Sequence, residues 1–130
     1  MMSGALCVMI IEDEDSVRES LQWYLEDLGH KVIAKIAPAW GSGERGEELL
    51  SNLACVDVLI VDQHLPGALG LDYIRQIQAG GCKIAPSRML LVSGDASSID
   101  MDQARALGVT VVQKPMTFQW FSEWLTERAG

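Results

Sequence analysis

Four short apolar runs, each followed at once by a polar residue, constrain the fold of this chain more than any other feature. They are Val8-Met9-Ile10-Ile11 before Glu12-Asp13, Val58-Leu59-Ile60-Val61 before Asp62, Met89-Leu90-Leu91-Val92 before Ser93, and Val111-Val112-Gln113 before Lys114. Such runs are typical of buried parallel strands. In open α/β sheets the carboxyl ends of the strands share one edge, where ligands bind. We therefore expect three acids, a hydroxyl and a lysine to meet there, a set suited to magnesium-assisted phosphoryl chemistry.

Strand-like and helix-like patterns alternate five times along the chain. Helical spacing predicts a first helix after the acidic cluster, ended by Gly29, with these residues inward: Val17, Leu21, Tyr24, Leu25 and Leu28. Further along we expect an edge strand over 31–37, a weaker helix over 41–53, a central strand over 57–61, a turn at 66–67 and a helix over about 69–79. Ser97 or Ser98 is expected to cap the fourth helix, which stops at Gly108. Right-handed crossovers then give an α/β fold with a doubly wound parallel sheet.

The last predicted helix opens at Thr117, with Phe118, Phe121 and Leu125 on its inner face. Trp120 and Trp124 lie one helical turn apart on it. They either cover the flank of the domain or form a docking or homodimer surface, because exposed aromatic residues are favoured at binding sites.

Length and charge narrow the function classes. A chain of 130 residues fits one domain, with an expected core over about 6–125. A net charge of −8 without a cluster of Lys or Arg argues against direct nucleic-acid binding, because phosphate backbones repel such a surface. The cysteine count is odd and no CxxC spacing occurs, which is typical of reduced thiols. No run resembles a signal peptide or a membrane span, so we expect a soluble cytoplasmic protein.

Taken together, four segments resemble the receiver domain of two-component response regulators. They are Ile10-Ile11-Glu12-Asp13-Glu14-Asp15-Ser16-Val17-Arg18, Val61-Asp62-Gln63-His64-Leu65-Pro66-Gly67 followed by Gly70, Leu91-Val92-Ser93-Gly94, and Gln113-Lys114-Pro115. Each segment alone is a weak signal, but their order and spacing together are specific. The resemblance covers about residues 6–125 and implies a flavodoxin-like (CheY-like) five-stranded sheet of order 2-1-3-4-5, for which CheY is a known example. It also implies a cis peptide bond between Lys114 and Pro115.

The resemblance implies a signalling phosphoacceptor with no turnover beyond its own phosphorylation and dephosphorylation. Asp62 is the implied nucleophile, which takes a phosphoryl group from a phosphohistidine. Asp13 and Asp62 are placed to give Mg²⁺ its carboxylates, the backbone carbonyl of His64 a third ligand, and Glu12 a ligand directly or through water. Lys114 and the Ser93 hydroxyl would bind the transferring oxygens.

The implied partners are a sensor histidine kinase or a histidine phosphotransfer protein, and a downstream partner or output domain. Phosphorylation would draw Ser93 and Lys114 inward and alter the face formed by the fourth helix, the fifth strand and the fifth helix. Receivers usually carry an aromatic residue three positions before the lysine, where this chain has Val111. A stand-alone receiver and a receiver from a longer regulator or hybrid kinase both fit the sequence.

Two alternatives remain open from the residues themselves. Asp13-Glu14-Asp15 imitates the Asp-x-Asp pair of haloacid-dehalogenase-like phosphohydrolases, in which Asp13 would be the nucleophile. That reading leaves Asp62 without a role, and such enzymes usually need a larger core. A flavodoxin-like module that binds a flavin phosphate is disfavoured, because the acids after the first strand would repel that phosphate.

Overall fold

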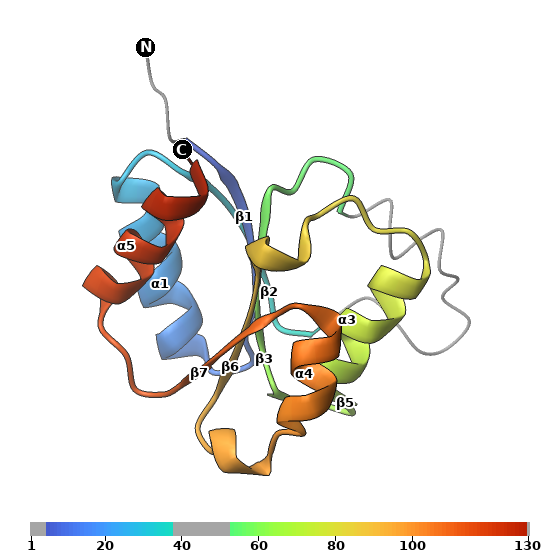
Figure 1. The fold of residues 1–130 in the computed structure, drawn as a ribbon. Coiled ribbons are helices and arrows are strands. Elements are labelled where there is room, and N and C mark those ends of the chain that lie inside the picture. The colour runs from blue at the N-terminus through green and yellow to red at the C-terminus, as the bar shows by residue number, and fades with distance from the viewer. Residues whose placement is uncertain (1–4, 38–52, 130) are drawn as a thin grey trace.

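The computed structural model describes residues 5–37 and 53–129, which form a five-stranded parallel sheet with helices on both faces. The strands are β1 (Cys7–Ile11), β2 (Lys31–Lys35), β3 (Val58–Asp62), β6 (Met89–Ser93) and β7 (Thr110–Gln113). Their order is β2-β1-β3-β6-β7 (Figure 1). This is the predicted order 2-1-3-4-5 once the two short hairpin strands, β4 (His64–Leu65) and β5 (Ala68–Leu69), are set aside.

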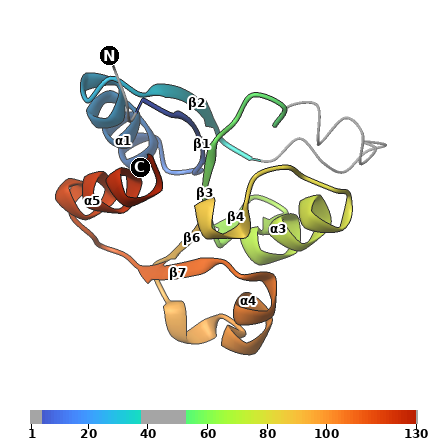
Figure 2. The same cartoon turned by 45° about the horizontal axis from the view of Figure 1, so that its top comes forward.

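The helices form two layers around the sheet. α1 (Asp15–Asp27) and α5 (Phe118–Ala129) lie on one side, while α3 (Gly70–Ala79) and α4 (Met101–Leu107) lie on the other (Figures 1 and 2). Successive strand residues alternate between the two cores, because side chains of a strand point to opposite faces. Val8 and Ile10 pack with α1 and α5, whereas Met9 and Ile11 pack with α3 and its neighbours.

The apolar content of each strand matches its place in the sheet. β3, the most apolar strand, is central and wholly buried, as predicted. β2 is an edge strand, shorter than the predicted 31–37, and exposes Lys31 and Lys35 at its two ends. Charged residues at a sheet edge discourage pairing with other chains. The helix predicted over 41–53 falls almost entirely outside the described residues.

A short hairpin joins β3 to α3. β4 (His64–Leu65) pairs with β5 (Ala68–Leu69) in antiparallel register around the predicted turn at Pro66 and Gly67. Gly67 has a φ of 71°, a left-handed conformation that a side chain disfavours. The sequence predicted the turn but not the hairpin, because each of its strands is only two residues long.

The prediction that Ser97 or Ser98 caps α4 is wrong. Both serines lie in a short 3-10 helix, η2 (Ala96–Ser98), and the N-cap is Asp100, whose carboxylate accepts a hydrogen bond from the Gln103 N–H. A carboxylate satisfies the first amides of a helix as well as a hydroxyl does. Gly108 ends α4 with a φ of 75°, as predicted.

Two residues that were predicted to point inward are exposed in the structure, and one of the two tryptophans of α5 is buried. Leu28 lies one residue beyond the end of α1 and is 43% exposed, and Phe118, 40% exposed, stacks on Tyr24 at 4.8 Å between ring centroids. Trp124 is 6% exposed and stacks on the half-buried Trp120, so Trp124 covers the domain's own flank. The peptide bond between Lys114 and Pro115 is cis, as the resemblance implies. Among residues 5–37 and 53–129, no helix is both long and apolar enough for a membrane crossing.

Candidate functional site

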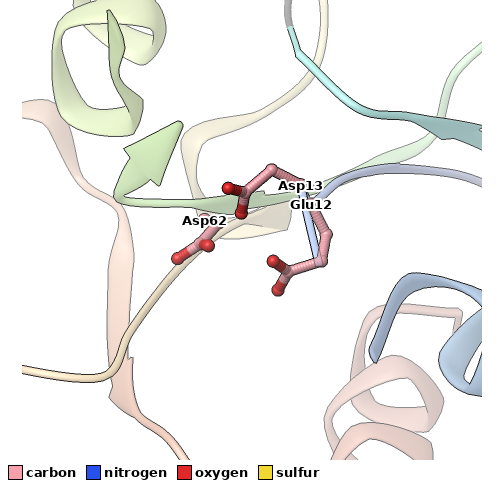
Figure 3. Close-up of side chains that lie close together, drawn as sticks. All are labelled: Glu12, Asp13 and Asp62. Atoms are coloured by element: carbon pink, nitrogen blue, oxygen red, sulfur yellow. The ribbon is translucent and has the colours of Figure 1, made fainter. Parts of the chain in front are cut away.

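Three carboxylates converge at the carboxyl ends of β1 and β3. Ile11 pairs with Val61 in the parallel ladder, so Glu12 and Asp13, which follow β1, lie beside Asp62, the last residue of β3. One oxygen from each of these three side chains lies within 4.8 Å of the other two (Figure 3). Glu12 and Asp62 are buried, at 5% and 7% exposure, whereas Asp13 is exposed. The predicted acidic cluster is therefore assembled in the fold.

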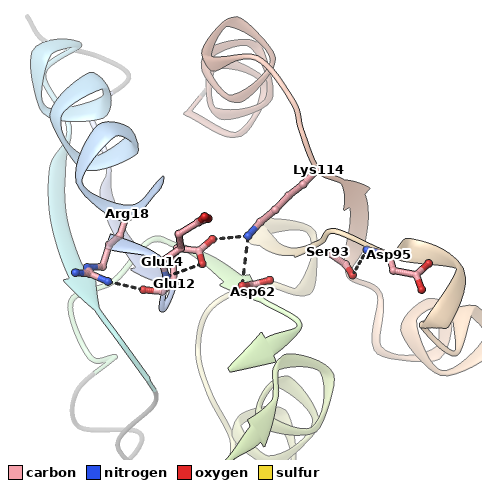
Figure 4. Close-up of polar contacts among 7 residues, drawn as sticks. All are labelled: Glu12, Glu14, Arg18, Asp62, Ser93, Asp95 and Lys114. Atoms are coloured by element: carbon pink, nitrogen blue, oxygen red, sulfur yellow. Dashed lines mark hydrogen bonds and ion pairs between the residues drawn. The ribbon is translucent and has the colours of Figure 1, made fainter. Parts of the chain in front are cut away.

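Lys114 reaches the same cluster from the loop after β7. Its Nζ lies 2.7 Å from Glu12 Oε1 and 3.3 Å from Asp62 Oδ2 (Figure 4). Burial alone would lower the pKa of the Lys114 ammonium, but the hydrogen bond to Glu12 and the negative charges of Asp62 and Glu12 outweigh it and raise the pKa. Lys114 is therefore a firmly charged cation that bridges the two buried carboxylates.

One cation does not neutralise three acids, so the cluster keeps an excess of two negative charges when all are ionised. Mg²⁺ prefers oxygen ligands and often takes one or two carboxylates, with water for the rest. The donor set of Glu12, Asp13 and Asp62 fits this ion in charge and in ligand type.

Backbone and side-chain contacts fix the direction of Glu12. The backbone N–H of Glu14 donates to Glu12 Oε2 at 3.1 Å, leaving Oε1 for Lys114. Arg18 on α1 donates from Nη1 to the Glu12 carbonyl at 2.9 Å and forms an ion pair with Asp15. The resemblance included Arg18 only as part of a motif. This hydrogen bond connects α1 to the backbone of Glu12.

The backbone around Asp62 is closely packed. A Cβ atom added to Gly70, the first residue of α3, would lie 2.4 Å from the Asp62 carbonyl oxygen and 2.9 Å from a methyl group of Leu91. The buried Gln63 accepts a hydrogen bond on its side-chain oxygen from the Leu71 N–H at 2.9 Å. Its carbonyl accepts another from the Gly70 N–H at 2.8 Å. α3 therefore begins against the segment that carries Asp62.

Ser93 is fully buried at the end of β6, the strand next to β3. Its Oγ accepts a hydrogen bond from the Asp95 N–H at 3.0 Å, and its carbonyl accepts one from the Lys114 N–H at 2.7 Å. Among the described residues, no hydrogen bond joins Ser93 Oγ to Asp62. Figure 4 draws the hydroxyl on the Asp95 side of the site.

His64 follows two residues after Asp62, at the start of the hairpin, and its side chain is exposed. Val111, at the position where an aromatic residue was expected, is half-buried and packs against the core on the side of α3 and α4.

A cleft of about 540 Å³ opens beside the charged cluster. Glu12, Asp62 and Lys114 line one part of it, and apolar side chains from β1, β3, β6, α1 and the start of α5 line most of the rest. The buried carboxylates are thus reached from the surface between α1 and α5.

Two glutamines form contacts that the sequence analysis missed. Gln63, the residue after Asp62, accepts a hydrogen bond from the first turn of α3. Gln113 forms hydrogen bonds with the loop after β6. Both stand directly beside a predicted site residue, which was the only signal. Glutamine has no residue-specific chemistry that would have singled either one out.

A family model described as "response regulator receiver domain" matches residues 8–125. Among curated proteins, the chain is 38% identical over 74 residues to a cyclic di-GMP phosphodiesterase of Thermotoga maritima, covering 57% of this chain and 18% of that protein. It is 32% identical over 95 residues to the sensory/regulatory protein RpfC of Xanthomonas campestris pv. campestris, covering 69% of this chain and 12% of that protein. The chain thus spans a small part of each.

Solved receiver structures share the fold. The receiver domain of the hybrid histidine kinase CckA aligns with a TM-score of 0.67 at 23% identity, covering 95% of this chain and 99% of that one. The chemotaxis protein CheY4 of Vibrio cholerae aligns with a TM-score of 0.73 at 22% identity, covering 95% and 98%. A CheY-like receiver domain of Methylobacillus flagellatus gives a TM-score of 0.74 at 21% identity with the same coverages.

Proposed function

The chain belongs to the response regulator receiver domain family, and we propose that it accepts a phosphoryl group from a phosphohistidine on Asp62. The observation that carries this proposal is the position of Asp62. It ends the central strand, it is buried, and it lies beside a lysine ammonium and two further carboxylates. Receivers are signalling modules rather than true enzymes, so turnover would be limited to the domain's own phosphoryl group.

The proposed transfer is a displacement at phosphorus. An oxygen of the Asp62 carboxylate forms the new P–O bond, and the P–N bond to the donor imidazole breaks, with its electron pair going to the nitrogen. The imidazole nitrogen that loses the phosphoryl group takes up a proton, so the donor histidine leaves as a neutral imidazole. The cleft beside Asp62 gives the incoming donor access between α1 and α5.

We propose that Glu12, Asp13 and Asp62 hold Mg²⁺, with the backbone carbonyl of His64 as a further ligand. The ion, when bound, would supply positive charge that offsets the repulsion between carboxylates and phosphoryl oxygens. The excess of negative charge in the cluster supports this assignment. The Glu14 N–H holds the Glu12 carboxylate in a fixed direction toward the site.

Lys114 and Ser93 are proposed to bind the phosphoryl oxygens. The Lys114 ammonium already lies 3.3 Å from Asp62 Oδ2, so it would neutralise charge where it develops. The Ser93 hydroxyl would donate a hydrogen bond to another oxygen after leaving its present position beside Asp95. Movement of the loop after β6 would then alter the face made by α4, β7 and α5, to which an output partner binds.

Receivers of two-component systems interact with histidine kinases and output domains. For this chain we propose a sensor histidine kinase or a histidine phosphotransfer protein as donor, and a cytoplasmic setting. We also propose that about residues 6–125 are the core of one receiver unit. The burial of Trp124 leaves less support for a homodimer through the two tryptophans of α5. The family match disfavours the phosphohydrolase alternative with Asp13 as nucleophile.

Intact-mass analysis with Mg²⁺ and acetyl phosphate tests the proposal. The wild type should gain one phosphoryl group in a Mg²⁺-dependent manner, and Asp62→Asn should gain none. Asp72→Asn, a change at a surface carboxylate on α3, is the matched control and should behave as the wild type. An adduct that persists in Asp62→Asn but is lost in Asp13→Asn would move the nucleophile to the position used by the hydrolases.

A further inference from the structure

Gln113 forms two hydrogen bonds to the loop between β6 and α4. It is the last residue of β7, directly before Lys114, and its side chain is exposed. Its Oε1 accepts the Ala96 N–H at 2.8 Å, and its Nε2 donates to the Gly94 carbonyl at 2.7 Å. One side-chain amide therefore binds the backbone at both ends of the three-residue segment from Gly94 to Ala96, which we call the 94–96 loop.

The same loop holds Ser93. The hydroxyl oxygen of Ser93 accepts the N–H of Asp95, the middle residue of the 94–96 loop, at 3.0 Å. The Lys114 N–H binds the Ser93 carbonyl at 2.7 Å, so the main chain of Ser93 is fixed on the other side. The direction of the Ser93 hydroxyl thus depends on where the 94–96 loop lies. Gln113 binds that loop from β7, while Ser97 and Ser98 hydrogen-bond Asp95 from within the same segment of the chain.

We propose that Gln113 is a positioning residue, which holds the Ser93 hydroxyl turned away from Asp62 in the unphosphorylated domain. This inference rests on the proposed function of Asp62 as phosphoacceptor. For Ser93 to reach a phosphoryl oxygen, its Oγ leaves the Asp95 N–H and the 94–96 loop shifts. That shift breaks the two bonds of Gln113, so their free energy opposes the switch.

Two features of the chain support this role. A Cβ atom added to Gly94 would meet nothing within 4 Å, so the start of the loop has open space on that side. Val111, in the position of the usual aromatic residue, gives little side-chain volume to couple with loop movement. Among the residues that the structure describes, the two bonds of Gln113 are the hydrogen bonds that join this loop to β7.

Beryllofluoride, a phosphoryl mimic, is the probe for the test. Its affinity in the presence of Mg²⁺ is measured by calorimetry for the wild type and for Gln113→Met, which keeps the side-chain length and removes both bonds. We expect binding roughly three- to tenfold tighter in the variant, because net hydrogen bonds each contribute a factor of a few. Gln119→Met, at an exposed glutamine on α5, should equal the wild type. Gln113→Ala serves the same purpose if the methionine variant does not fold.

Two further measurements separate positioning from a general structural effect. The affinity for Mg²⁺ alone should be unchanged in Gln113→Met, because neither Gln113 nor Ser93 belongs to the acidic cluster. In a Ser93→Ala background, Gln113→Met should no longer tighten beryllofluoride binding, because no hydroxyl has to be released. A gain that persists there would overturn the inference.

Equal or weaker beryllofluoride binding by Gln113→Met, alongside normal binding by the wild type, would overturn the positioning role of Gln113. The phosphoacceptor proposal would remain intact. No binding by the wild type would count against Asp62 as phosphoacceptor, and the inference would fall with it.

Discussion

The two halves of the site are held in different ways. In the acidic half, Glu12, Asp13, Asp62 and Lys114 lie together, and ion pairs of 2.7 and 3.3 Å join Lys114 to the two buried carboxylates. In the hydroxyl half, Ser93 is bound by the 94–96 loop instead. The acidic half is thus already assembled for chemistry, while the hydroxyl half is held apart from it (Figure 4).

This difference separates two free energies that a receiver has to balance. Under the proposed function, the acidic half would set the affinity for Mg²⁺ and the rate of phosphoryl transfer, because its charges are already in position. The hydroxyl half would set how readily the loop after β6 rearranges once a phosphoryl group is present. Substitutions in the first half should therefore affect chemistry, and those in the second should affect the switch.

The largest effect is expected from Lys114→Met. Loss of the ammonium removes the cation beside Asp62 Oδ2, so the rate of phosphorylation by acetyl phosphate should fall about a hundredfold, as for other preorganised charge-stabilising groups. The rate is followed by mass spectrometry at saturating Mg²⁺. Lys83→Met, at an exposed lysine outside the site, is the control. A loss of less than threefold would contradict the role of Lys114.

A second contrast compares a glycine that packs against the backbone of Asp62 with a glycine in the 94–96 loop. Gly70→Ala should lower the free energy of unfolding by about 2 kcal/mol, because its Cβ would lie 2.4 Å from the Asp62 carbonyl oxygen. Gly94→Ala should change it by less than about 0.5 kcal/mol, because a Cβ there has open space. Urea unfolding measures both. Equal losses in the two variants would contradict the close packing behind Asp62.

Ser93→Ala should have a smaller effect, and mainly on the switch. Beryllofluoride affinity should fall a few fold, because the hydroxyl that is proposed to donate to the bound group is lost. The free energy of unfolding should fall by about 1 kcal/mol, because the hydrogen bond from the Asp95 N–H is lost. The affinity for Mg²⁺ should stay the same. Ser20→Ala, at an exposed serine on α1, controls for the loss of a hydroxyl elsewhere. A large fall in Mg²⁺ affinity would mean that the two halves are not separate.

The smallest expected effect is on stability at alkaline pH. Hydrogen bonding to Glu12 and the charges of Asp62 and Glu12 outweigh burial and raise the pKa of Lys114 above its ordinary value of 10.5. The folded state then keeps a proton that the unfolded state loses, so stability from this group is complete below pH 10.5 and declines as the pH rises through the folded-state pKa.

The wild type should therefore lose more stability than Lys114→Met as the pH rises from about 10.5 to about 11.5, the window above the ordinary lysine pKa. Urea unfolding with a metal chelator measures the difference, and other titrating groups cancel in the comparison. A larger loss in the variant would contradict the assigned direction.

The sequence predicted the sheet well, because a buried parallel strand has a local signature. β1, β3 and β6 are runs of apolar residues, and the residue after each run lies at the sheet edge by topology alone. For this reason the sequence analysis could predict that Asp62 and Lys114 lie close together, although they are 52 positions apart in the sequence.

Contacts that depend on the path of a loop could not be predicted in the same way. Asp100 caps α4 because Ser97 and Ser98 lie in η2, ahead of the helix. No local sequence pattern shows which of these three residues directly precedes the helix. The two bonds of Gln113 depend on loop geometry that only the folded chain defines.

The most direct test of the account is to find which residue carries the phosphoryl group. The protein is phosphorylated with acetyl phosphate and Mg²⁺, the acyl phosphate is reduced with borohydride, and the peptides are sequenced by mass spectrometry. Reduction converts a phosphorylated aspartate to homoserine. The account predicts homoserine at position 62 and aspartate at position 13. Homoserine at position 13, or an adduct on another type of side chain, would contradict it.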